Sequence, residues 1–440
     1  MFLYKNKNWK VLFYDDCMLD KMFAIENDLK SGRTVIKICG LKISFINKNI
    51  IYKPDYSEII SRIQNKYQNN EKIRVGFFVN QNAKWNAENL YNLFADHKAF
   101  EPVVLVTAYD TLHKQKDLTK DSVEENYNFF KSTGKNVLKA YDEDDHKYLD
   151  LKQFDIDILF YQQPWGFDKT QSIDVVSNYS LCCYYAYGIS VLDCALEVRP
   201  FHEKLYSYFV PNEQTFQHLK KYEINDLSNM KIVGYPKLDV YNNLTKEEAP
   251  KKTIIYAPHH SYNRGLQIGT FDKLSKKILE FAKQHNEYNW IFKPHPDLKE
   301  VLYKDRRFGK KFVDEYYQEW SELGQSYEKG NYFEMFMNSD LLITDCDSFL
   351  LEYMPTLSPI IRLERKGATN LSELGQEIIK GIYRVNNFKE FEKIFNDLML
   401  NNSDNLLESR KNITENIIRK TKNASGNIVQ ELEKILEERS

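Results

Sequence analysis

The sequence lacks any long hydrophobic run. A membrane-spanning helix needs about 18 consecutive apolar residues, and no stretch of this chain approaches that length. The first residues, MFLYKNKNWKVLFYDD, place charged side chains inside every short apolar run, so we expect neither a signal peptide nor a membrane anchor. The prediction is a cytoplasmic protein, with peripheral association at the inner face of the membrane as an open alternative.

Cysteine patterns that would indicate a cross-link or a metal site are also missing. The six cysteines form no C-x-x-C pair and have no histidine at the spacing of a zinc site. This pattern argues against a disulfide framework and predicts reduced thiols in the protein core. The cysteine pattern thus also disfavours zinc, and we expect no metal ion.

An excess of charge of one sign is absent as well. The 61 Lys and Arg residues are matched by 63 Asp and Glu residues, which leaves a formal net charge of −2. Such a chain has no overall field to hold a nucleic-acid backbone or an anionic membrane, so no nucleic-acid partner is expected. With 42% hydrophobic residues the composition is that of a globular protein, and 440 residues exceed what one hydrophobic core usually holds.

The pattern that is present indicates an α/β protein. Short apolar runs alternate with amphipathic segments, beginning with VGFFVN at 75–80, a predicted helix at 85–97 and PVVLVTA at 102–108. Buried strands that alternate with helices are typical of a parallel sheet covered on both faces. A polar tract at 242–252 predicts a linker, after which the same plan repeats.

We therefore predict two Rossmann-like domains with parallel sheets that face one interdomain cleft. A short strand-rich segment precedes them, and its role cannot be inferred from the residues. The predicted ranges are an N-terminal appendage at 1–70, a first domain at 71–243, a second domain at 244–425 and a C-terminal helix at 426–440.

Polar residues that directly follow predicted strands indicate where a ligand would bind. In open parallel sheets the ligand lies beyond the carboxyl ends of the strands. Three of the four clearest segments belong to the second domain, so the main binding site is expected there. The segments are GYPK at 234–237, PHHS at 258–261, KPHP at 293–296 and TDCDS at 344–348.

The TDCDS segment runs into the apolar stretch FLLEYM and predicts the start of a helix. The free N–H groups of a helix start suit a phosphate, and the hydroxyls of Thr344 and Ser348 could add donors. Asp345 could equally cap the helix. The D-x-D pattern here is weak support for a metal, because both aspartates compete as caps. Glu352 lies one turn deeper, where it suits ribose hydroxyls or is an ordinary exposed glutamate.

Histidines gather after two separate strands of the second domain. His259 and His260 follow one strand, and His295 follows another, two residues after Lys293. Histidine titrates near neutrality and can accept a proton from a hydroxyl nucleophile, and a cation at a strand end can contact a diphosphate. A lone histidine is more often structural, but three in this arrangement favour a reaction centre.

The first domain supplies amides, aromatic rings and small residues after its predicted strands. This mixture suits a polyol or a sugar, although it also suits ordinary loops. The candidate residues on this side are Lys84, Trp85, Gln163 and Tyr187.

Four motifs together resemble a known family. VGYPKLD at 233–239, IIYAPHHS at 254–261, FKPHPD at 292–297 and SDLLITDCDSFLLEYMPTLSPII at 339–361 occur in the order and spacing of the CDP-glycerol glycerophosphotransferases, which make teichoic-acid and capsular polymers. The resemblance is strongest in the second half of the chain. It implies a GT-B architecture in which the C-terminal domain holds most of the CDP-linked donor and the first domain faces the acceptor.

The resemblance also implies a reaction and a donor site. An acceptor hydroxyl attacks the polyol-bearing phosphate of a CDP-polyol, and CMP leaves. No cofactor is implied beyond the CDP-linked donor. The residues implied at the donor are Gly234, Pro236, Lys293, His295, Thr344, Asp345, Ser348 and Glu352.

The sequence departs from the family pattern at the expected base. Members typically carry a Trp-His-Gly segment in the first domain, where this chain reads Tyr-Ala-Tyr-Gly at 185–188. Many members also have Thr-Trp where this chain has His259 and His260. We therefore predict a divergent member in which His259 or His260 accepts the proton and His295 steadies the diphosphate.

Three functions fit these motifs. The first is transfer of a polyol phosphate from a CDP-linked donor to a hydroxyl of a cell-surface glycan or lipid-linked polymer. The second is a GT-B glycosyltransferase that uses a nucleotide sugar in capsule or lipopolysaccharide synthesis. The third is a non-catalytic assembly protein with the transferase fold, motivated by the missing histidine. The retained KPHP and TDxxS segments favour catalysis.

Overall fold

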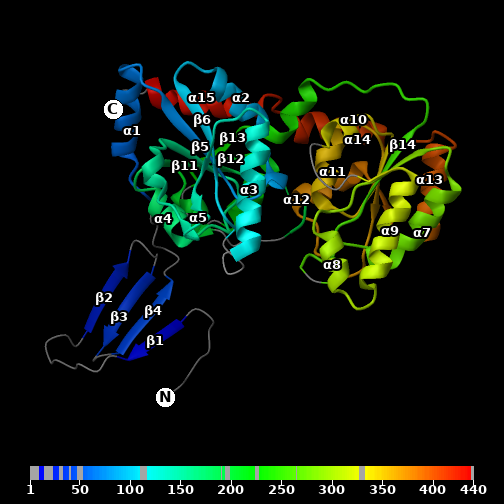
Figure 1. The fold of residues 1–440 in the computed structure, drawn as a ribbon, viewed down its shortest axis with the longest axis horizontal. Helices are drawn as coiled ribbons and strands as arrows, with labels where there is room; N and C mark the ends of the chain where they lie inside the picture. The colour runs from blue at the N-terminus through cyan, green and yellow to red at the C-terminus, as the bar shows by residue number, and fades with distance from the viewer. Residues whose placement is uncertain are drawn as a thin grey trace.

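The computed structural model describes residues 9–13, 23–28, 33–38, 41–46, 53–109, 116–189, 191–193, 199–222, 227–263, 265–326 and 332–437. Two large sheets, one small antiparallel sheet and a two-stranded ribbon lie within these residues. Figure 1 shows the two large sheets as separate helix-covered units side by side, with the small sheet set apart near the N-terminus. None of the helices in the described part of the chain has the length and apolarity to span a bilayer.

The small N-terminal sheet has four antiparallel strands in the order β1-β4-β3-β2. Helix α1 follows it, within the range 1–70 that the sequence assigns to the appendage. Ile59 and Ile63 of this helix are buried in the core of the first large sheet, so α1 packs as part of the first domain. The elements are β1 (Trp9–Phe13), β2 (Phe23–Asp28), β3 (Arg33–Ile38), β4 (Leu41–Ile46) and α1 (Ser57–Gln68).

The first large sheet is parallel throughout, with the strand order β13-β12-β11-β10-β5-β6-β7. Its strands are apolar on both faces: Phe77 belongs to the core on one side and Phe78 to the core on the other. The strands are β5 (Ile73–Val79), β6 (Phe100–Val106), β7 (Val137–Lys139), β10 (Ile158–Tyr161), β11 (Leu181–Tyr185), β12 (Ser207–Val210) and β13 (Met230–Ile232).

Helices and short connections cover this first sheet. They are η1 (Asn82–Lys84), α2 (Glu88–Asp96), α3 (Lys116–Ser132), the ribbon β8 (Tyr141–Asp142) and β9 (Lys147–Tyr148), η3 (Leu151–Phe154), η4 (Lys169–Gln171), α4 (Ile173–Val176), α5 (Arg199–Lys204) and α6 (Glu213–Tyr222). The 3-10 helix η5 (Pro236–Asn242) then leads to the second sheet.

The second large sheet is also parallel, with the order β16-β15-β14-β17-β18-β19. It has one core on each face, since Ile254 and Ile255 belong to different clusters. Its strands are β14 (Thr253–Ala257), β15 (Asn289–Phe292), β16 (Gln325–Ser326), β17 (Leu341–Thr344), β18 (Ile360–Leu363) and β19 (Tyr383–Val385). Its helices are α7 (Phe271–Gln284), α8 (Leu298–Lys304), α9 (Gly309–Leu323), α10 (Phe333–Met337), α11 (Asp347–Tyr353), η6 (Met354–Thr356), α12 (Glu373–Ile378), η7 (Ile379–Gly381), α13 (Phe388–Met399), α14 (Leu407–Ile413) and the π-helical turn η8 (Thr414–Ile418). The two parallel α/β domains confirm the fold class predicted from the alternating pattern.

The C-terminal helix α15 (Ala424–Glu437) returns to the first domain. Figure 1 shows it beside α2, although most of the second domain separates the two helices in the sequence. Its residues Ile428 and Leu432 enter the core beneath the first sheet, and His97 lies 2.9 Å from Glu433. The chain therefore crosses between the domains twice.

The start of α15 is fixed by the segment that follows β13. Asp239 accepts hydrogen bonds from the backbone N–H groups of Ala424 and Ser425, at 3.0 and 2.7 Å. Gly234 has a φ of +102°, and an added Cβ would lie 2.8 Å from both the Ala424 Cβ and the Thr421 carbonyl oxygen. Only glycine meets both conditions, so Gly234 holds the C-terminal crossing in place.

The substitution Gly234→Ala should therefore destabilise the protein strongly. We expect the free energy of unfolding to fall by about 3 kcal/mol, from backbone strain and overpacking together. The matched control is Gly134→Ala, where φ is +77° but nothing lies within 4 Å of the added Cβ. Strain alone should cost about 1 kcal/mol there. Urea unfolding of both variants measures the difference, and equal losses would contradict the packing argument.

Candidate active site

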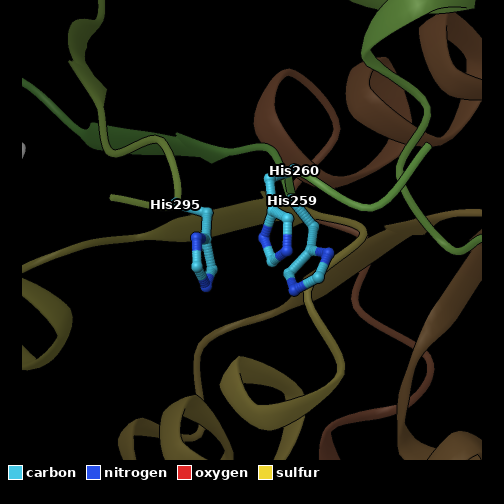
Figure 2. A group of neighbouring side chains, drawn as sticks. All are labelled: His259, His260 and His295. Atoms are coloured by element: carbon cyan, nitrogen blue, oxygen red, sulfur yellow. The ribbon is translucent and has the colours of Figure 1, made fainter. Parts of the chain in front are cut away.

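The candidate site lies at the carboxyl ends of β14, β15 and β17. These three strands are neighbours in a parallel sheet, so the loops that follow them meet at one edge. The ring centroids of His259 and His260 are 4.3 Å apart, and that of His295 lies 4.8 and 4.1 Å from them. Figure 2 shows the three imidazoles side by side. The fold thus brings together the histidines of two segments that are separate in the sequence.

Asp345 connects the loop after β17 with the histidine loop after β14 through buried hydrogen bonds. Its side chain is 2% exposed and accepts the backbone N–H of His259 at 2.6 Å on one oxygen. Its other oxygen accepts the N–H and the hydroxyl of Thr270, at 2.5 and 2.7 Å. Burial raises the pKa of this carboxyl to about 6. Asp345, implied at the donor phosphate by the motif, is thus fully engaged in positioning the histidine loop.

Thr344 is likewise engaged inside the protein. Its hydroxyl donates to the carbonyl of Ala257 at 2.6 Å and accepts the N–H of Cys346 at 3.0 Å. Ser348 stands in the first turn of α11, where its hydroxyl is 3.5 Å from the sulfur of Cys346. Of the two hydroxyls that the TDCDS segment suggested as donors, the partly exposed Ser348 is the one at the surface of the site.

Backbone hydrogen bonds decide which ring nitrogens of the histidines carry protons. The N–H of Ser261 donates to Nδ1 of His259 at 3.1 Å, and the N–H of Asp297 donates to Nδ1 of His295 at 3.1 Å. A backbone N–H can only donate, so in the neutral ring the proton sits on Nε2. Burial lowers the pKa of His259 to about 3, and burial with neighbouring cations lowers that of His295 well below its usual value. Both rings are neutral N–H donors at pH 7.

This arrangement fits an anion better than a metal ion. One ligand nitrogen from each of His259, His260 and His295 lies within 4.8 Å of the others, close enough to suggest a cation site. A metal-bound histidine, however, donates its second N–H to a carbonyl or a carboxylate. His259 and His295 do the opposite, because their Nδ1 atoms accept. The pair therefore presents hydrogen-bond donors to a bound oxygen.

Lys293 lies beside the histidines in a nearly closed setting. The residue is 3% exposed, and its ammonium lies 5.1 Å from the ring centroid of Tyr332 and 5.7 Å from that of Phe349. Burial lowers the pKa of this lysine to about 8. The lysine still carries a positive charge at pH 7, in a place where water screens it little.

Glu352 is paired inside the protein. Its carboxylate accepts the Lys237 ammonium at 2.8 Å and the hydroxyl of Tyr332. The hydroxyl of Tyr235 lies 3.5 Å from the same carboxylate and 2.9 Å from the carbonyl of Tyr187 in the first domain. This cluster links the two domains. The Glu352 carboxylate, which the resemblance assigned to a ribose contact, therefore already has hydrogen-bond partners within the protein.

The motif residues Gly234 and Pro236 are also part of the packed interior. Gly234 touches the start of α15, and Pro236 is buried at the first turn of η5. Lys237 was included in the GYPK segment without being given a role, and Thr270 and Tyr332 were missed at the level of the sequence. These two residues follow no strand and form no motif, so only the tertiary fold shows their contacts.

The first domain contributes Lys84, Gln163 and Tyr187. The Lys84 ammonium donates to the Gln163 side-chain oxygen at 2.6 Å and lies 5.1 Å from the ring centroid of Tyr187. Burial lowers the pKa of Lys84 to about 8, opposed by the charge of Asp297 in the second domain. Burial raises the pKa of Tyr187, and the carboxylates of Asp347 and Asp297 raise it further. These electrostatic interactions cross between the domains, and the charge of Lys84 also contributes to the lowered pKa of His295.

Trp85 lies elsewhere. Its ring packs in the core of the first domain, 4.9 Å from Phe130 and 5.7 Å from Phe77. The indole N–H donates to Glu88 at 2.8 Å. The position next to Lys84 suggested an acceptor contact, but consecutive residues on a short helical turn point in different directions, and here the tryptophan points inward.

Comparisons with known proteins agree with this architecture. Structural neighbours include a putative UDP-N-acetylglucosamine 2-epimerase from Listeria monocytogenes (TM-score 0.52, 14% identity, 84% of this chain and 98% of that chain). A second is the UDP-GlcNAc 2-epimerase from Neisseria meningitidis (TM-score 0.51, 14% identity, 82% and 100%). A third is the wall teichoic acid polymerase TagF (TM-score 0.53, 12% identity, 87% and 93%). At such identities these neighbours show the GT-B fold alone.

The sequence itself carries the family signal. A search of curated protein sequences finds no match. Residues 201–366 match the family described as "CDP-Glycerol:Poly(glycerophosphate) glycerophosphotransferase". This range contains the PHHS, KPHP and TDCDS segments from which the site is built. The resemblance found in the motifs is thus confirmed over residues 201–366, where the chain is similar to the CDP-glycerol glycerophosphotransferase family.

Proposed function

We propose that this protein transfers a polyol phosphate from a CDP-linked donor to a hydroxyl of a glycan or polymer acceptor, with release of CMP. The observation that carries the proposal is the convergence of His259, His260 and His295 beside Lys293, within the range that matches the family. A wall teichoic acid polymerase among the structural neighbours adds support.

The site has the groups that phosphoryl transfer needs. Positioning and charge stabilisation supply most of the catalysis in such reactions, because the transferred phosphoryl group spreads negative charge over its oxygens. His259 and His295 each offer an Nε2–H donor, and the poorly screened Lys293 offers a positive charge. We therefore place the polyol-bearing phosphate against these three side chains, with Ser348 as a further donor.

A glycosyltransferase that uses a nucleotide sugar is the second candidate. The fold similarity to the UDP-GlcNAc 2-epimerase from Neisseria meningitidis favours it, because that structure holds UDP-GlcNAc in the same two-domain fold. The anion-binding groups of this site would serve its diphosphate equally well. A non-catalytic assembly protein would bind a nucleotide at the same place without turnover.

Nucleotide release distinguishes these functions. Purified protein is incubated with CDP-glycerol, CDP-ribitol, UDP-GlcNAc or a GDP-sugar, together with a lipid-linked or oligosaccharide acceptor, and released nucleotides are separated by chromatography. We expect acceptor-dependent CMP from a CDP-polyol. Because the histidines fit an anion, EDTA should leave this rate unchanged. Release of UDP or GDP would support the glycosyltransferase, and binding without any release would support the assembly protein.

A further inference from the structure

We infer that Lys84 of the first domain accepts the proton of the attacking hydroxyl. The inference rests on the proposed function and adds a catalytic residue to it. Its starting point is the histidine cluster, because two of the three rings cannot be the base. His259 and His295 accept backbone N–H groups at Nδ1, so their Nε2 atoms carry protons and can only donate.

His260 is the remaining imidazole. Its Nδ1 atom is buried without a hydrogen-bond partner among the described residues, so only Nε2 of this ring is open to a substrate. Its ring packs 4.1 Å from that of His295, on the donor side of the site. The acceptor is expected on the side of the site formed by the first domain. A general base for its hydroxyl is therefore better supplied by a side chain of that domain.

Lys84 stands at that opposite side and is held in a defined position. It ends η1, the turn directly after β5, and its ammonium donates to Gln163 at 2.6 Å. The Gln163 amide is itself fixed, because its nitrogen donates to the Trp165 carbonyl at 2.8 Å. The rings of Tyr187 and Tyr109 flank the ammonium, with centroids at 5.1 and 5.8 Å.

The surroundings of Lys84 bring its deprotonation close to neutral pH. In the described part of the chain Lys84 forms no ion pair with a carboxylate, and burial lowers its pKa to about 8. The titratable groups that face it are Tyr109, Tyr187, Asp297 and His295, whose own pKa is lowered in part by the Lys84 charge. The charges of Lys84 and His295 therefore influence each other across the two domains, and we place the reacting groups between them.

The step balances as follows. The acceptor oxygen forms a bond to the polyol-bearing phosphorus while the bond from that phosphorus to the CMP oxygen breaks. The hydroxyl proton moves to the neutral Nζ of Lys84, and CMP leaves with the electron pair of the broken bond. Lys84 then loses the proton to water. The charge that develops on the transferred phosphoryl oxygens faces the Nε2–H groups of His259 and His295.

The variants Lys84→Met and Lys84→Arg test this role in the CMP-release assay. We expect kcat of the wild-type protein to rise with pH and level off above about 8, because only the neutral amine accepts a proton. Lys84→Met should lose about a hundredfold in kcat, as a missing general base does, with the KM for the CDP-linked donor unchanged. Small primary amines such as ethylamine should restore part of the rate, increasingly with the basicity of the amine. Lys84→Arg should fold but stay inactive, since guanidinium does not lose its proton.

Lys135→Met is the matched control. Lys135 is also a buried lysine of the first domain flanked by aromatic rings, at 5.8 Å from Trp85 and 5.5 Å from Tyr91, but it pairs with Glu88 outside the site. Its removal should leave kcat and the pH profile unchanged. Circular dichroism spectra of all variants verify folding.

Two results would overturn the inference while leaving the proposed function intact. One is CMP release by Lys84→Met or Lys84→Arg at the wild-type rate. The other is a flattened pH profile in His260→Gln, rescued by imidazole, with a normal profile in Lys84→Met, which would make His260 the base. A wild-type protein that releases no CMP from any CDP-linked donor would instead refute the proposed function, and the inference with it.

Discussion

Replacement of Asp345 by alanine is expected to lower the free energy of unfolding by about 3 kcal/mol and to lower turnover about a hundredfold. The side chain is buried and accepts three hydrogen bonds, from the N–H of His259 and from the N–H and hydroxyl of Thr270. Each buried donor left without an acceptor costs about 1–3 kcal/mol. Relief of the desolvation that raises the pKa of Asp345 offsets part of this loss.

The loss of activity has a separate cause. The Asp345 carboxylate fixes the backbone of His259, and the N–H of His295 in turn donates to the Pro258 carbonyl at 2.9 Å. Without the carboxylate the two histidine loops lose their common anchor. A displacement of about 1 Å at a reacting centre costs on the order of a hundredfold in rate.

Urea unfolding and the CMP-release assay measure the two effects of Asp345→Ala. Thr270→Val removes only the hydroxyl donor and should cost about 1 kcal/mol. Asp340→Ala is the matched carboxylate control, because Asp340 accepts the N–H of Thr253 at 2.7 Å at the opposite, amino end of β14. It should lose stability and keep its kcat. An Asp345→Ala protein as stable and as active as wild type would show that the three hydrogen bonds do not position the site.

The second large effect is expected for His295. His295→Ala should lower kcat by about a thousandfold, because removal of one donor to a developing oxyanion costs about 10²–10³. The ring is oriented by the Asp297 N–H on Nδ1 and by its contacts with His259 and His260, so Nε2–H has a defined direction. The affinity for the CDP-linked donor should fall as well, because the proposed site places the same N–H against the donor phosphate before the reaction.

Two variants make this prediction specific. His295→Gln places an amide N–H near the former Nε2 position and should recover about tenfold of the loss. His285→Gln is the control, since His285 belongs to the same domain but pairs with Glu287 at 2.9 Å after α7, away from the strand ends that carry the site. Donor affinity by calorimetry and kcat by CMP release are measured together. Unchanged values for His295→Ala would remove His295 from the site.

The alternation of strands and helices was readable in the sequence because both faces of a parallel sheet are buried. Runs such as the VGFFVN segment of β5 are apolar at consecutive positions, and Phe77 and Phe78 indeed enter cores on opposite faces. The meeting of His259, His260 and His295 was predictable for a related reason. The carboxyl ends of neighbouring parallel strands share one edge, whatever the sequence distance between them.

The roles of single side chains were not readable in the same way. Thr344, Asp345 and Glu352 stand where a phosphate or ribose contact is expected, yet the structure turns them toward Ala257, Thr270 and Lys237. Hydrogen-bond partners of this kind come from segments far away in the chain. No local sequence pattern predicts these partners, because the side chain of a polar residue after a strand can point either toward a ligand or toward the protein interior.

By itself, the sequence determined two parallel α/β domains, the sheet edge at which the candidate site residues gather and the family that residues 201–366 resemble. Hydrophobic periodicity and motif order are properties of the sequence, so both can be recognised without the tertiary structure. The tertiary structure alone decided that Trp85 packs inward, that the charge of Lys84 influences His295 and that α15 returns to the first domain. These outcomes depend on packing and burial between distant segments, which exist only after the chain has folded.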